Sequence, residues 1–113
     1  MRVLVCGGRD FKDAALLSVV LGFLHDKHGI DTLIHGDARG ADRLAAKWAF
    51  RRPIHIRAFP ADWTTYGRSA GYVRNAEMLE KGRPDMVVAF SGGRGTKMMV
   101  QLAEESGVRV LRW

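Results

Sequence analysis

The sequence has a single cysteine and no long apolar segment, and both absences narrow the class of protein. Because Cys6 is alone, no intrachain disulfide can form, and its place at the end of an apolar run is typical of a buried, inert thiol. The longest apolar run, residues 14–24, is too short to cross a bilayer and is interrupted by Gly22. No signal-peptide pattern opens the chain, because residues 7–10 break the first apolar run too early. These observations predict a cytoplasmic protein without a membrane segment.

Low-complexity tracts and long linkers are also absent, so we expect one domain spanning residues 1–113. With 47% hydrophobic residues, the chain can bury a substantial core. Its net charge of +6 and isoelectric point of about 10.1 favour anionic partners such as nucleotides or nucleic acid. A basic surface without a specific partner would explain the same charge equally well.

Short apolar runs alternate with stretches of helical periodicity along the whole chain. The pattern predicts strands at residues 2–6, 31–35, 54–59, 85–90 and 108–111. It predicts three helices at about 11–28, 41–50 and 71–81, and a fourth that follows the glycine segment ending at residue 96. Residues 60–70 are expected to form a long loop. Such alternation is typical of an α/β fold with a doubly wound parallel sheet. We expect a single Rossmann-like domain whose five-stranded sheet has the order 3-2-1-4-5, which places ligands where the first and fourth strands meet.

Three glycine-containing segments follow predicted strands and should meet at one edge of the sheet. A glycine turn before a helix can bind phosphate, because small residues expose backbone N–H groups to the anion. The alternative is a tight turn that only joins strand to helix. We favour phosphate binding for residues 92–96, while the two interpretations are nearly equal for Gly7 and Gly8. The candidate ligand-binding residues are Gly7, Gly8, Arg9, Gly36, Asp37, Arg39, Gly40, Asp42, Arg74, Asn75, Gly92, Gly93, Arg94, Gly95 and Thr96.

Several side chains have a structural interpretation beside the functional one. Asp42 is more simply explained as the cap of the second helix, which leaves Asp37 as the freer carboxylate. Arg74 is expected in the first turn of the third helix, where a cation opposes the helix dipole, and this placement points to a bound anion. Trp63 and Tyr66 could stack on a base or pack their loop onto the sheet.

Short segments that match a known family occur in the same order along nearly the whole chain. They are residues 7–10, 35–36, 39–42, 61–63 with 67, 70–71, 74–75 with 78, and 90 with 92–96. Together they resemble the SLOG superfamily, the nucleotide-binding Rossmann-like domains of the Smf/DprA and Lonely-guy proteins, and most closely its YspA-type group. The resemblance implies a nucleotide-derived ligand. It also implies self-association through helices, hence a homo-oligomer.

Lonely-guy enzymes are phosphoribohydrolases that release the base from cytokinin nucleoside monophosphates. Arg74 and Met78 fit their helix motif, with Asn75 in the place of a lysine. Residues 92–96 fit their phosphate loop, with Ser91 in the place of a proline. The resemblance therefore implies that the phosphate-binding parts are retained.

The glutamate of that enzyme motif is replaced by Met99. A methionine can neither stabilise an oxocarbenium-like transition state nor activate water. Glu77 is the one carboxylate that could take over, so Arg74 and Glu77 are the candidate catalytic residues if the chain is an enzyme.

We therefore expect a module that binds or senses a nucleotide or nucleotide-derived ligand. The alternative is a phosphoribohydrolase-like nucleotide N-glycosidase. A further alternative is single-stranded nucleic-acid binding, motivated by basic residues that could equally form a solvated helix face: Arg39, Arg43, Lys47, Arg51, Arg52 and Arg57. We predict no cofactor and no metal, because no second ligand stands at metal spacing from His35. Met78, Met98 and Met99 are expected in the core or at a dimer interface.

Overall fold

Five parallel strands form one sheet in the computed structural model, which describes all 113 residues. The strands are β1 (Arg2–Cys6), β2 (Thr32–His35), β3 (His55–Ala58), β4 (Met86–Ala89) and β5 (Arg109–Arg112). They lie in the order β3-β2-β1-β4-β5. The predicted fold class and strand order are confirmed.

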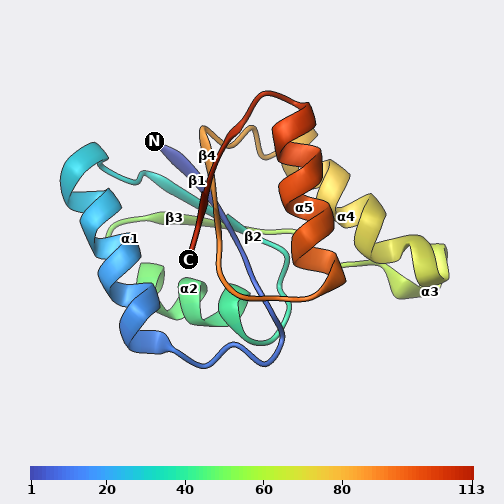
Figure 1. The fold of residues 1–113 in the computed structure, drawn as a ribbon, viewed down its shortest axis with the longest axis horizontal. Coiled ribbons are helices and arrows are strands. Elements are labelled where there is room, and N and C mark those ends of the chain that lie inside the picture. The colour runs from blue at the N-terminus through green and yellow to red at the C-terminus, as the bar shows by residue number, and fades with distance from the viewer.

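Helices cover both faces of this sheet, as Figure 1 shows. One face carries α1 (Ala14–His28) and α2 (Ala41–Phe50), and the other carries α4 (Ala70–Glu80) and α5 (Arg94–Glu105). Two core clusters fill the spaces between sheet and helices, one on each face. Strands β1, β2 and β4 are buried almost throughout, which explains why their sequences are continuously apolar rather than alternating. No helix has the length and apolar character needed to cross a membrane.

The segment predicted as a long loop contains a helix and is a correction to the sequence analysis. Residues Trp63–Tyr66 form α3, and Gly67–Ser69 form a 3₁₀ turn that leads into α4. The Asp62 carboxylate caps α3 by accepting a hydrogen bond from the Thr65 N–H at 3.0 Å. A four-residue helix is too short to show helical periodicity, so the sequence pattern could not reveal it.

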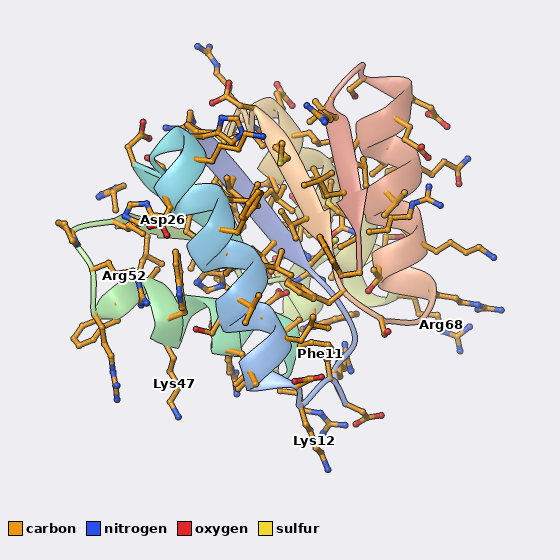
Figure 2. All side chains as sticks on the ribbon, turned by 60° about the vertical axis from the view of Figure 1, so that its left-hand side comes forward. Phe11, Lys12, Asp26, Lys47, Arg52 and Arg68 are labelled. Atoms are coloured by element: carbon orange, nitrogen blue, oxygen red, sulfur yellow. The ribbon has the colours of Figure 1, made fainter.

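Helix α1 begins three residues later than predicted. The Asp13 carboxylate caps the helix by accepting a hydrogen bond from the Leu16 N–H at 3.0 Å. The Phe11 ring lies 5.0 Å from the Phe90 ring, which binds the preceding segment to the end of β4. Figure 2 shows Phe11 and Lys12 in this loop below α1. Residues 7–13 are therefore available at the edge of the sheet where the other loops meet.

Candidate functional site

A cleft of about 800 Å³ lies outside the carboxyl ends of β1 and β4. These two neighbouring strands lead to helices on opposite faces of the sheet, α1 and α5, so their loops diverge and leave a crevice between them. The loops after β1, β2 and β4 all reach the same edge of the molecule in Figure 1. The predicted position of the site, at the meeting of the first and fourth strands, agrees with this cleft.

Backbone hydrogen bonds at Gly8 tie the three loops together. The Gly8 N–H donates to Ser91 O at 2.7 Å, and Gly8 O accepts from the N–H groups of Phe11 and Ala41. Gly40 packs against this point with φ of +86°, and a Cβ there would overlap Gly8 O and Arg9 O. Gly40 is therefore required for the loops to approach one another and does not itself line the cleft.

The loop after β4 contributes the most donors to the cleft. Helix α5 begins at Arg94, so Arg94, Gly95 and Thr96 form its first turn and are not part of the loop as predicted. Its N-cap residue, Gly93, has no side chain to cap the helix. The N–H groups of residues 92–96 donate no hydrogen bond within the chain, and all five residues line the cleft. Five consecutive backbone donors at the start of α5 therefore face the cleft without a partner in the chain.

Asp42 has a different role from the predicted helix cap. Its carboxylate accepts from the Gly36 N–H at 3.0 Å and from the Ala38 N–H at 3.3 Å, so it fixes the loop after β2. Burial raises the pKa of Asp42 to about 6, although these two hydrogen bonds and the charge of Arg74 act in the opposite direction. No side chain caps α2, whose N-cap residue is Gly40. The prediction failed because the sequence does not reveal that the loop folds back over the carboxylate.

Arg74 lies between the cleft and the loop after β2. Its guanidinium donates to Gly36 O at 2.6 Å and to Asn75 Oδ1 at 2.9 Å. Asn75 is buried and donates in turn to Gly95 O in the first turn of α5. Because α4 begins at Ala70, Arg74 lies in the second turn of the helix, so the predicted first-turn placement and its dipole argument are wrong. The hydrogen bond to Gly36 O explains its orientation instead.

The carboxylates of the cleft all have partners in the chain, whereas three of its positively charged side chains make no ion pair. Each carboxylate already has a partner, since Asp13 caps α1, Asp42 binds two N–H groups, and Asp10 pairs with Arg39 at 3.4 Å. Arg9, Lys12 and Arg94 line the cleft and make no ion pair. The cleft therefore presents unpaired positive charge to a ligand.

Most of the predicted binding residues meet in this cleft, with exceptions at its borders. Gly36, Asp37 and Arg39 line a smaller adjoining hollow together with Trp63, whereas Tyr66 lines neither space. Glu77 also lies outside both and approaches Lys81 at 3.9 Å. Sequence reasoning missed residues 10–13 as cleft-lining residues, because it assigned that segment to the start of α1.

Sulfur-containing side chains form part of the cleft wall. Met78 and Met99 are buried in the core on the α4–α5 face and still border the cleft, whose lining also includes Cys6. Burial, followed by the nearby charge of Asp42, raises the pKa of the Cys6 thiol to about 12. The thiol is therefore protonated at neutral pH and is not a nucleophile.

Comparisons with known proteins agree with this architecture. A family model described as "YspA, cpYpsA-related SLOG family" matches residues 1–66, which run from β1 to the end of α3. The Gene 61 protein of Mycobacterium phage D29 is 36% identical over 121 residues, and the match covers 99% of this chain and 95% of that protein. No solved structure matches the chain.

The match of the family model includes the loops after β1 and β2, and the match to the phage protein also spans the loop after β4. At the coarse level, this relationship indicates a nucleotide-related ligand. From its fold, its cleft and these matches, the chain belongs to the YspA, cpYpsA-related SLOG family.

Proposed function

We propose that the protein is a binding or sensing module for a nucleotide or nucleotide-derived ligand, held through a phosphate group in the cleft. The observation that carries this proposal is the row of five free backbone N–H groups at residues 92–96. Backbone donors at a helix N-terminus bind a phosphate without a desolvated countercharge, and the helix dipole adds a favourable field.

The surrounding side chains fit the same ligand. Arg9, Lys12 and Arg94 provide positive charge without ion-pair partners, so binding of a phosphate breaks no existing ion pair. Thr96 adds a hydroxyl donor in the first turn of α5. Binding rather than catalysis is favoured because Met99 occupies the position of the glutamate in the related hydrolases.

Native mass spectrometry of the protein with a panel of nucleoside monophosphates, dinucleotides and ADP-ribose tests the proposal. We expect intact adducts that stay unchanged over hours and a higher melting temperature in the presence of the bound compound. Thr96→Val should weaken this binding by roughly tenfold, since it removes one donor to a charged group. Thr64→Val, an equivalent change on exposed α3, should not.

Two results would contradict the proposal in different ways. Absence of any adduct or thermal shift across the panel would exclude nucleotide binding. Release of free base with formation of ribose 5-phosphate would instead establish the N-glycosidase alternative. In that case Asp10 and Asp13 would be the first carboxylates to substitute, because both line the cleft whereas Glu77 lies outside it.

A further inference from the structure

A second, smaller hollow of about 300 Å³ adjoins the main cleft. It lies between the loop after β2 and the segment that follows β3. The two spaces share Arg9, Ala38 and Arg74 in their walls, so a ligand in the cleft can extend into the hollow without leaving the surface. The hollow lies beside the phosphate site proposed above and adds Arg39, Arg43 and Trp63, which do not line the main cleft.

The hollow carries an excess of positive charge. Four arginines line it, namely Arg9, Arg39, Arg43 and Arg74, against the single carboxylate of Asp37. Only Arg39 is ion-paired, through an exposed contact with Asp10 at 3.4 Å. Four guanidinium groups around one small space repel one another, and an anion between them would relieve the repulsion.

The pKa values of Arg74, in the wall of the hollow, and of His35, at the end of β2, are lowered first by burial, and nearby arginine charges add to both decreases. Burial lowers the pKa of Arg74, and the nearby charge of Arg9 lowers it further, against the opposing effect of Asp42. Burial likewise lowers the pKa of His35, with Asp37 opposing and Arg43 adding to the decrease. Arg9 and Arg43 therefore lie close enough to influence these groups, and neither makes an ion pair.

An aromatic side chain completes the hollow. Trp63, the first residue of α3, lines it with 51% of its surface exposed. The Asp62 cap holds α3 in place, so the indole is presented by an ordered element at the border of the arginine cluster. An exposed indole beside guanidinium groups is the combination with which proteins bind a base together with its phosphate.

We propose that this hollow is a second nucleotide subsite and that the ligand class is a dinucleotide with two phosphate groups. One phosphate lies on the N-terminus of α5, the second lies among Arg9, Arg43 and Arg74, and the second base stacks on Trp63. This inference rests on the proposed function for the first phosphate, and it adds the size and charge of the ligand.

Calorimetric titration with paired probes tests the inference on the full chain. Each pair is a nucleoside 5′-monophosphate and the corresponding 5′-phosphorylated dinucleotide, AMP with pApA and GMP with pGpG. We expect the dinucleotide of at least one pair to bind at least about tenfold more tightly than its monophosphate, because stacking and a second phosphate contact are added.

Two variants and their matched controls assign this gain to the hollow. Trp63→Ala and Arg43→Gln should each remove most of the dinucleotide advantage and leave monophosphate affinity unchanged. Both side chains are exposed, so the fold should survive, as circular dichroism would verify. Tyr72→Ala, an exposed aromatic on α4, and Lys47→Gln, one turn beyond Arg43 on α2, should change neither affinity.

The outcomes separate this inference from the proposed function. Equal affinity for both members of each pair would overturn the second subsite and leave nucleotide binding intact. Equal weakening of both probes by Trp63→Ala would also overturn it, because the indole would then belong to the first site. If neither member of either pair binds, the second subsite is overturned, and the wider panel described above decides the proposed function separately.

Discussion

At the scale of single residues, Asp42 is a buried carboxylate whose role is decided by its surroundings. Its pKa of about 6 lies above the ordinary value of 3.8, so the native state holds the proton more tightly than the unfolded chain does. Its contribution to stability is therefore fully present below about pH 4 and is lost as the pH rises through 6.

This linkage predicts a difference between the natural protein and Asp42→Asn. Relative to the variant, the free energy of unfolding of the natural protein should fall by about 2 kcal/mol between pH 4 and pH 7. Urea unfolding of both proteins across this range measures the difference, and other carboxyl groups cancel in the comparison. Parallel pH profiles would show that Asp42 is not perturbed by burial.

Gly40 also has a role that depends on its surroundings, because it packs against the backbone of Gly8 and Arg9. Gly40→Ala would combine a positive φ with overlap against the backbone of Gly8 and Arg9, so we expect a loss of at least about 2 kcal/mol of stability. Gly93→Ala is the control, because no atom lies within 4 Å of the added methyl group and φ there is −96°. Thermal unfolding of both variants measures this, and similar melting temperatures would contradict the packing argument.

At the scale of elements, the start of α5 lacks the features that usually stabilise a helix N-terminus. Its first turn has no acidic residue and begins with Arg94, so the positive end of the helix dipole faces another positive charge. Arg94→Glu should therefore stabilise the free protein by about 0.5 kcal/mol while it weakens phosphate binding.

A matched charge reversal at the C-terminus of another helix provides the control. Arg51 lies at the C-terminal cap of α2, so Arg51→Glu should destabilise the free protein slightly and leave ligand binding unchanged. Melting temperatures with and without AMP measure both effects. Undiminished AMP binding by Arg94→Glu would contradict the placement of phosphate at α5.

At the scale of the whole molecule, the net charge of +6 is partly concentrated along one helix. Arg43 and Lys47 on α2 and Arg51 at its C-terminal cap lie four residues apart and are exposed. Figure 2 shows Lys47 projecting away from the sheet. By contrast, Arg52 stacks on Trp48 with its guanidinium carbon 4.2 Å from the ring centre, so it has a structural role. The α2 residues alone form a row that single-stranded nucleic acid could contact.

If this row binds single-stranded DNA, three phosphate contacts should give a slope of about −2 in a plot of log affinity against log salt. The double variant Lys47→Glu, Arg51→Glu should abolish a gel shift without changing nucleotide affinity, since both residues lie outside the cleft. A shift that persists in high salt would contradict this electrostatic account.

The expected homo-oligomer also stays a prediction, which sedimentation equilibrium would test.

The sequence by itself determined the fold class, whereas the expected strand order was one of several doubly wound orders and was confirmed by the structure. Continuous apolar runs at β1, β2 and β4 require burial on both faces, and their alternation with helices leaves a doubly wound parallel sheet as the natural arrangement. The sequence also determined which loops meet, because the carboxyl ends of parallel strands share one edge.

Only the tertiary structure decided what each side chain at that edge does. Asp42 was expected as a cap and proved to hold a loop, because its partners are N–H groups four and six residues earlier in a turn that no periodicity encodes. Trp63 lies on α3, a helix too short for the sequence pattern to predict. Its position beside the arginines depends on contacts between segments distant in sequence. Local patterns set the elements, whereas the balance of charge and the free donors of the cleft emerge only when several loops are packed together.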